Sequence, residues 1–424
     1  MSLTLQALSA IEILDSRGRP TLSVRAVTSA GERVSAGVPS GASTGTKEAV
    51  ERRDGDPARY GGLGVGQAVE AVNGEIAELL VGRSFPDQPA LDAALIELDG
   101  MPDKSRLGAN ALVGVSMAAA RAFAAVEGVE LWRSLAAGAS WHAQVPPRLP
   151  VPHLNVVNGG VHAPNELDFQ EFMLAPIGAP SFAEALRAGA ETYGALRRLL
   201  TSRGDQTGLG DEGGFAPQIR EPEEVLSLLV QAIEAAGYAL GRQGIALAMD
   251  PASSELYRDG AYHVAGEALS SDQLIERYVA MAERFPLWLL EDGLAESDWE
   301  GWSRLTARLG ERLELVGDDI FCTNPALIDE GIRRRTATAS LIKLNQIGTV
   351  TETLQAMVRC REAGWTQLVS HRSGETDDAF IADLAVATGC GRIKSGAPAR
   401  GERVAKYNRL LEIEATTDLA YGLG

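Results

Sequence analysis

The chain contains few of the residues that build disulfide scaffolds or redox centres. Its 424 residues include only three cysteines, Cys322, Cys360 and Cys390, which are far apart and show no CxxC spacing. This pattern excludes a disulfide framework and gives no support to a zinc or dithiol site. We expect the three thiols to be reduced and buried.

Positive charge and long apolar segments are also scarce. Lysine and arginine number 39 against 57 acidic residues, a formal charge of −18. Such a surface repels phosphate backbones and anionic lipids, so neither nucleic acid nor a membrane surface is expected as a partner. The start, MSLTLQALSAIEILDSRG, lacks the basic and apolar regions of a signal peptide, and nowhere do about 18 uncharged apolar residues run together. We therefore expect a cytoplasmic protein without a membrane span.

The composition, 45% hydrophobic and 23% charged, is that of a globular protein large enough for two domains. Residues 21–29 and 31–40 alternate apolar and polar side chains, which predicts an antiparallel hairpin. Residues 65–82 and 107–128 have helical spacing, and the second is so rich in small residues that we expect it to be packed on several sides. A proline-rich stretch around residue 140 then predicts a boundary between a smaller α+β domain, 1–138, and a second domain, 139–424.

The second part of the chain contains short apolar runs that each end in an ionisable residue. These residues are spaced 23 to 41 positions apart, enough for one strand, a returning helix and loops: Asp250, Glu291, Asp318, Lys343, His371 and Lys394. Residues 324–335, 349–364 and 376–389 have the spacing of the intervening helices. This repeat predicts a closed parallel barrel of the TIM-like (β/α)8 type.

Earlier segments are expected to complete the barrel. Residues 149–160, 169–176 and 208–214 would supply the remaining strands and bring in His162, Glu171 and Glu212. Such barrels place their chemistry at the carboxyl ends of the strands. We therefore predict that all these ionisable groups converge on one mouth.

Three acids at successive strand ends indicate a metal site. A single acid there commonly caps a helix or joins a salt bridge. Asp250, Glu291 and Asp318 together would repel one another with no obvious counter-charge, unless a divalent cation lies between them. An all-carboxylate set favours Mg²⁺ or Mn²⁺ over zinc.

Lys343 is unusual because it interrupts the apolar run LIKLNQIG. It can lie at a strand end with its ammonium reaching solvent. If it instead faces the metal, burial and the cation should both lower its pKa, so that the amine serves as a base. A neutral lysine opposite Mg²⁺ suits removal of a proton from a carbon next to a carboxylate, with the metal stabilising the enediolate.

Eight segments carry a family resemblance: ILDSRGRPT, VPSGASTG, LNVVNGGVHA, DFQEFM, GLGDEGGFAP, LIKLNQIGTVTET, SHRSGETDD and IKSGAPARGERVAKYN. In order and spacing they resemble the signature segments of the enolase family over most of the chain. The resemblance implies an enolase-type barrel with a smaller N-terminal domain. It also implies a glycolytic hydro-lyase that reversibly dehydrates 2-phospho-D-glycerate to phosphoenolpyruvate with two Mg²⁺ ions, the second arriving with substrate.

The resemblance also implies roles for individual residues in catalysis. Lys343 would remove the C2 proton, and Glu212 with Glu171 would protonate the departing C3 hydroxyl, positioned by Gln170. The three strand-end acids would hold the first Mg²⁺. The loop SGASTG can be an ordinary turn, but it resembles the family's mobile lid, in which Ser43 would give oxygen to the second Mg²⁺.

The remaining implied roles concern substrate binding. Lys394 would bind the substrate carboxylate, and Arg372 and Ser373 would hold the phosphate. His162 and His371 would line the closed site.

Two departures from the family pattern lie near site segments, Arg19 in RGRP and Val161 before His162. They leave open a paralogue acting on a related phosphonate or carboxyphosphonate in secondary metabolism, and a scaffold or adhesion role is a third alternative. The resemblance implies a homodimer or an octamer, and the sequence does not choose between them.

Overall fold

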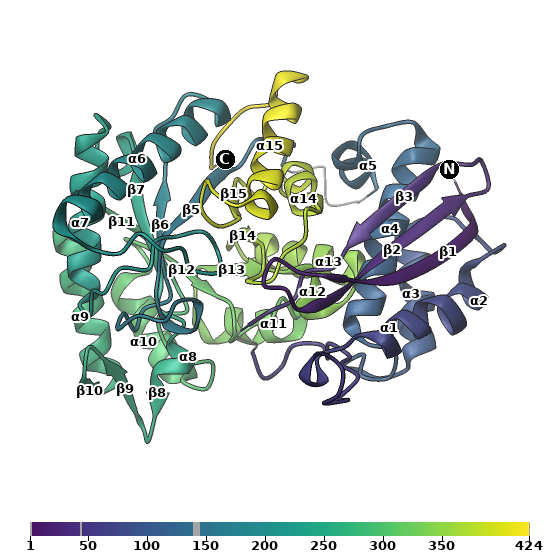
Figure 1. Cartoon of the computed structure of the whole chain (residues 1–424), viewed down its shortest axis with the longest axis horizontal. Coiled ribbons are helices and arrows are strands. Elements are labelled where there is room, and N and C mark those ends of the chain that lie inside the picture. Colours follow the sequence, from purple (N-terminus) through teal and green to yellow (C-terminus); the bar gives the residue numbers. More distant parts are fainter. Residues whose placement is uncertain (1, 43–44, 139–144, 424) are drawn as a thin grey trace.

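The computed structural model describes residues 2–42, 45–138 and 145–423. An N-terminal sheet with its helices lies beside a closed barrel surrounded by helices (Figure 1). The sheet has the order β3-β2-β1-β4, built from β1 (Leu3–Leu14), β2 (Pro20–Thr28), β3 (Arg33–Gly37) and β4 (Ser84–Phe85). The predicted hairpin is confirmed as the antiparallel pair β2 and β3.

Strand β1 was not predicted, although it pairs with β2 over most of its length. A bulge between Leu5 and Ala7 shifts the phase of its alternation. Its far end also exposes apolar residues, with Ile11 41% and Leu14 55% exposed. Both features hide the period of two by which a strand is recognised in a sequence.

The two predicted N-terminal helices are present. The first is divided into α1 (Gly66–Ala71), a π-helical segment η2 (Val72–Ile76) and α2 (Ala77–Leu80), with non-helical dihedrals at Gly74. The second is α4 (Ala109–Glu127), in which residues 109–124 except Arg121 are buried. The described residues of this part also form η1 (Tyr60–Gly62), α3 (Gln88–Asp99) and α5 (Leu131–Ala137).

Among the described residues, α4 is the one helix that is long and apolar enough to cross a membrane by length and composition, and 83% of the relevant window is buried inside the protein. The same helix contacts β2, β3, α3 and α5, so its apolar surface is used in packing. It is the core helix that the small residues indicated.

The predicted barrel is confirmed as a closed ring in the order β11-β12-β13-β14-β15-β5-β6-β7. Its strands are β5 (Val151–Asn158), β6 (Glu171–Ala175), β7 (Ala246–Asp250), β11 (Leu287–Glu291), β12 (Glu314–Gly317), β13 (Ala339–Ile342), β14 (Thr366–Ser370) and β15 (Arg392–Lys394). Small and branched side chains such as Ala248, Leu289 and Val316 fill its interior, and a larger apolar core lies between the barrel and its helices.

The expectation of an all-parallel barrel is wrong at β6, which runs antiparallel to both β5 and β7. The connection from β5 to β6 contains only the short helix η4 (Gly160–His162), and without a crossover helix the chain returns in the opposite direction. Residues 208–214, expected as a strand, form a loop that pairs only through isolated bridges such as Leu209 with Phe215.

Helices cover the outside of the barrel, and the three predicted ones are present as α11, α13 and α14. The covering helices are α6 (Phe182–Arg203), α7 (Pro222–Ala235), α9 (Ser271–Arg284), α10 (Trp299–Leu309), α11 (Pro325–Arg334), α13 (Val350–Glu362), α14 (Phe380–Thr388) and α15 (Gly401–Ala415). Asn324 and Thr349 accept hydrogen bonds from the first turns of α11 and α13, which fixes where each helix begins.

Smaller elements extend the barrel loops. The short helices are η5 (Gly241–Gln243), α8 (Ser253–Leu256) and α12 (Leu344–Ile347), and a small antiparallel sheet that was not predicted comprises β8 (Tyr257–Arg258), β9 (Ala261–Val264) and β10 (Glu267–Leu269). The α12 turn directly follows Lys343.

Candidate active site

The strand ends bring the predicted ionisable residues to one mouth of the barrel. Asp250, Glu291 and Lys394 are the last residues of β7, β11 and β15. Asp318, Lys343 and His371 each follow a strand by one residue. Since β7, β11 and β12 are neighbours, the three acids predicted as metal ligands come from adjacent strands.

The reversed strand β6 explains how Glu171 joins them. Glu171 is its first residue, and it pairs in register with Asp250 at the end of β7. An antiparallel strand presents its beginning where parallel strands present their ends. Glu171 therefore lies at the functional mouth even though the strand runs the other way.

Lys394 lies among three of these acids. Its Nζ is 2.7 Å from Oε1 of Glu291, 3.1 Å from Oε2 of Glu171 and 3.4 Å from Oδ2 of Asp250, and its side chain is 3% exposed. Burial opposes the charge on this ammonium, but the three carboxylates raise the pKa of Lys394 well above its ordinary value. The group is a fixed cation in the site.

Lys343 forms a second pair, with Nζ 2.5 Å from Oδ2 of Asp318. Burial lowers the pKa of Lys343, but the charge of Asp318 outweighs it and the pKa is raised. The predicted depression of this pKa is therefore wrong for the arrangement described. The expectation that the acids have no counter-charge is also wrong, because each lysine provides one.

The site nevertheless keeps an excess of negative charge. Burial, followed by the charge of Asp250, raises the pKa of Glu291 well above its usual range despite the contact with Lys394. Asp318 is adjacent to Asp292 and Asp319, whose carboxylate oxygens lie within 4.8 Å of one another and of its own. Clustered buried carboxylates with too few ammonium groups fit a divalent cation bound through oxygen.

Asp292 is a neighbouring acid that the sequence reasoning did not name. Its two oxygens accept hydrogen bonds from the backbone N–H groups of Asp318 (2.8 Å) and Asp319 (3.1 Å). It thereby fixes the turn after β12. In the sequence Asp292 is the residue after Glu291, and nothing local relates it to Asp318 and Asp319, which lie 26 and 27 positions further along the chain.

Two glutamates and two histidines form the opposite side of the mouth. Glu212 accepts hydrogen bonds at Oε2 from Asn155 Nδ2 (2.9 Å) and lies 3.2 Å from His371 Nε2. His162 Nδ1 is 3.7 Å from Glu212 Oε1 and 4.0 Å from Glu171 Oε1. All four side chains are buried, so each charge there strongly affects the others.

This environment separates the proton affinities of the two glutamates. Burial and then the charge of Glu212 raise the pKa of Glu171 to about 8. Burial would also raise the pKa of Glu212, but His371 and His162, which face it, hold that pKa well below its usual range. Of the two glutamates, Glu171 therefore has the higher proton affinity and is the better placed to supply a proton as an acid.

The predicted phosphate side is linked to the N-terminal part of the chain. Arg372 makes a two-point contact with Glu48, at 2.9 and 3.2 Å, and donates to Oδ1 of Asn345. Ser373 Oγ accepts from Arg17 Nη1 at 3.0 Å. Glu48 and Arg17 were missed because they lie more than 300 positions from their partners.

A small cavity of about 20 Å³ lies between these groups. This volume corresponds to about one water molecule. It is lined by His162, Gln170, Glu171, Glu212, Asp250, Lys343, Ser370, His371, Arg372, Ser373 and Lys394.

Unpaired polar atoms point to a ligand at this cavity. Among the described residues, Oε1 of Gln170 and both ring nitrogens of His162 are buried without a hydrogen-bond partner. Buried polar groups are normally paired, so these atoms fit contact with substrate. Of the predicted site residues, Ser43 lies outside the described part of the chain.

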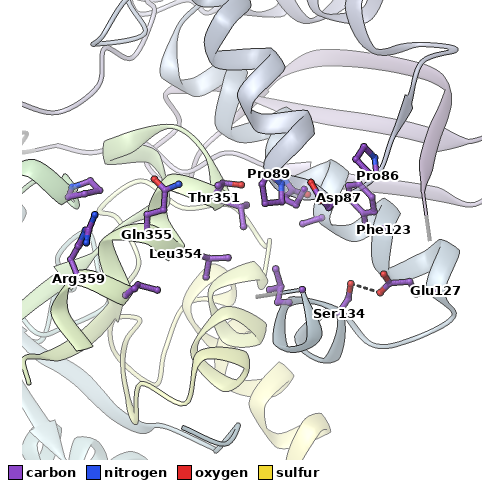
Figure 2. Close-up of a pocket in the computed structure, with 17 residues that line it drawn as sticks. Pro86, Asp87, Pro89, Phe123, Glu127, Ser134, Thr351, Leu354, Gln355 and Arg359 are labelled. Atoms are coloured by element: carbon purple, nitrogen blue, oxygen red, sulfur yellow. Dashed lines mark hydrogen bonds between the residues drawn. The ribbon is translucent and has the colours of Figure 1, made fainter. Parts of the chain in front are cut away.

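A larger cavity of about 630 Å³ lies elsewhere, between the N-terminal helices and α13 (Figure 2). Phe123 and Leu354 line it, and Ser134 donates to Glu127 at its edge. Among the described residues, none of those predicted for the site lines this cavity, and the charged residues that do line it are Asp87, Glu127 and Arg359. Size alone therefore does not mark the chemical site.

Comparison with known proteins gives one consistent result. Residues 147–421 match the family model described as "Enolase, C-terminal TIM barrel domain", and residues 5–135 match "Enolase, N-terminal domain". A curated enolase from Rubrobacter xylanophilus is 56% identical over 95% of this chain and 93% of its own length. A second, from Acidothermus cellulolyticus, is also 56% identical, over 98% and 95% respectively.

Proposed function

Because the chain belongs to the enolase family, we propose that it catalyses the reversible dehydration of 2-phospho-D-glycerate to phosphoenolpyruvate in glycolysis. This is a lyase reaction, the phosphopyruvate hydratase activity. The observation that supports it most directly is the convergence at one barrel mouth of two lysines, an acid pair and a group of carboxylates. Removing a proton from C2 and hydroxide from C3 requires such a set.

Family membership implies a metal cofactor, and the carboxylate set fits one. We assign Asp250, Glu291 and Asp318 to a first Mg²⁺, with Ser43 contributing to a second ion that arrives with substrate. When bound, the metal supplies positive charge that stabilises the enediolate oxygens.

Lys343 is the proposed base. In the arrangement described its ammonium donates to Oδ2 of Asp318, whose charge stabilises the protonated form. When Asp318 serves as a ligand, its charge no longer supports the ammonium, and burial then favours the neutral amine. Lys343 can then take the C2 proton, while Lys394 binds the substrate carboxylate and offsets the charge that develops on it.

The acid pair acts on the other side of the substrate. Glu212 and Glu171 deliver the proton that converts the C3 hydroxyl into water, and Gln170 positions that hydroxyl. Arg372 and Ser373 hold the phosphate, for which the guanidinium geometry is well suited. His162 and His371 line the site and shield it from solvent.

The coarser organisation of the protein belongs to the same proposal. We assign residues 1–138 to the N-terminal domain and 139–424 to the barrel domain, and we expect a cytoplasmic homodimer or octamer. The alternative of a phosphonate substrate was motivated by Arg19 and Val161. Both residues are exposed and neither lines the cavity, so they do not favour that alternative.

The test is direct turnover. The purified protein is mixed with 2-phosphoglycerate and Mg²⁺, and the ultraviolet absorbance of the enol product is followed. A chelator and the Lys343→Ala variant serve as controls, and both should abolish the signal. Absence of turnover by a folded, metal-binding protein would contradict the proposal.

A further inference from the structure

Arg403 is a fully buried residue of α15 that reaches the back of the acid pair. Its side chain is 0% exposed. Its Nη1 lies 2.5 Å from His371 Nδ1 and 2.6 Å from the carbonyl oxygen of Arg372. Its Nη2 donates to the carbonyl oxygens of Ser373 (2.6 Å) and Asp211 (3.1 Å). A single guanidinium therefore joins the loops that carry His371 and Glu212.

The chemistry of arginine decides the tautomer of His371. A guanidinium has only donors, and the two hydrogens of Nη1 are directed to the Arg372 carbonyl and to His371 Nδ1. Nδ1 must therefore be an unprotonated acceptor. The neutral ring then carries its proton on Nε2, and the imidazolium form is disfavoured because its Nδ1–H would face an N–H of Arg403.

The tautomer in turn determines how Glu212 is used. His371 Nε2 lies 3.2 Å from Oε2 of Glu212 and, among the described residues, has no aligned hydrogen-bond partner of its own, so this oxygen is the acceptor nearest to its N–H. The same oxygen accepts from Asn155 at 2.9 Å. An oxygen that accepts from Asn155 and faces a second N–H from His371 is a poor position for a proton. The other oxygen, Oε1, faces His162 and the neighbouring Glu171.

We propose that Arg403 is a positioning residue for the reaction: by fixing the Nε2–H tautomer of His371, it keeps Oε2 of Glu212 occupied as an acceptor and leaves Oε1 as the oxygen through which the proton passes. The role given to Glu212 rests on the proposed function, whereas the tautomer of His371 does not. A low pKa for His371, about 3, agrees with a ring that stays neutral, since burial and the charge of Arg403 both oppose protonation.

The first test measures the tautomer directly. The chain has five histidines, so nitrogen-15 NMR of the imidazole rings is tractable, with the His371 signals assigned by their loss in His371→Gln. We expect a neutral ring protonated on Nε2 throughout the range from pH 6 to 8. A ring protonated on Nδ1, or an imidazolium at pH 7, would overturn the proposal. This measurement needs no turnover and no variant of Arg403, so it remains decisive if such a variant fails to fold.

The second test uses Arg403→Met with Lys406→Met as its matched control. Lys406 is a buried cation on the same helix that contacts Glu375 and the Thr376 carbonyl but not His371. In Arg403→Met we expect loss of the uniform His371 tautomer and a fall of about 10- to 100-fold in hydroxide loss from C3. Exchange of the C2 proton should change by less than about threefold, because Lys343 lies on the other side of the site.

The pH profile gives a further readout. Once Arg403 is removed, His371 can become protonated, so activity of Arg403→Met should fall as the pH drops through about 6.5, while the parent stays level there. Lys406→Met should keep the parent tautomer and the parent profile shape. Equal loss of both chemical steps in Arg403→Met, with His371 unchanged, would show a purely structural role and refute the proposal.

Discussion

Replacing Lys394 with methionine tests whether an internal ammonium compensates the buried acids. Methionine keeps much of the volume of lysine but leaves Glu291, Glu171 and Asp250 without their shared cation, which contacts them at 2.7, 3.1 and 3.4 Å. Breaking a buried ion pair by removing one partner costs about 3–5 kcal/mol. With an unfolding entropy of about 2.1 cal/mol/K per residue, that cost lowers the Tm of a chain of this length by about 3–6 °C.

The same variant should respond more strongly to Mg²⁺ than the parent. A divalent cation that binds the freed carboxylates stabilises the folded state by RT ln(1 + c/Kd), where c is the free Mg²⁺ concentration, so tighter binding gives a larger rise in Tm. We therefore expect Mg²⁺ to recover most of the lost Tm in Lys394→Met, although activity stays low because the substrate carboxylate has lost its partner. Differential scanning fluorimetry with and without Mg²⁺ measures both shifts.

Lys104→Met is the matched control. Lys104 is also buried, with a 4% exposed side chain, and its Nζ lies 2.7 Å from Glu352 of α13, away from the mouth. Its loss should lower Tm without making the protein more responsive to Mg²⁺. The reasoning would be refuted if Lys394→Met lay within about 1 °C of the parent in chelator, or if Mg²⁺ recovered both variants equally.

Three further predictions concern catalysis and pH. Lys343→Ala should abolish exchange of the C2 proton while calorimetry shows Mg²⁺ binding at least as tight as in the parent, because Asp318 loses its competing ammonium; exchange at the parent rate would remove Lys343 as the base. In Glu212→Gln we expect C2 exchange to persist while hydroxide loss is suppressed, and equal loss of both would indicate a positioning role. Burial, then the charge of Arg392, lowers the pKa of His153 to about 3. The unfolded state therefore binds the extra proton between about pH 6.5 and 3, and the free energy of unfolding should fall in acid by up to about 1.4 kcal/mol per pH unit from this residue. His153→Gln should have a shallower acid dependence in urea titrations, and an unchanged slope would contradict this account.

The strand ends were predictable because the information is local. Each apolar run and the ionisable residue that ends it can be read within a few positions, and the parallel repeat places those ends together. Glu171 was also expected at the mouth, but for an incorrect reason, since β6 begins there instead of ending there. Its direction depends on the missing crossover helix, which a list of apolar runs does not reveal.

Partnerships across the closed barrel were not predictable from the sequence. Lys394 and Glu291 are 103 positions apart, and Glu48 and Arg372 are 324 apart. No local pattern relates such residues, because their contact depends on how the ring closes and how the N-terminal part packs on it. The contact of Lys343 with Asp318, which raises the pKa of the lysine in the arrangement described, was missed for the same reason, although its burial was inferred.

The two buried ammonium groups also bear on how far folding depends on the metal. In small metal-dependent domains the ligands repel one another without the ion, so folding waits for the metal. Here Lys394 and Lys343 come from the same chain as the acids they contact, so the barrel closes around its own cations. We therefore expect the chain to keep its fold in chelator while it loses activity, and to recover activity when Mg²⁺ is added back.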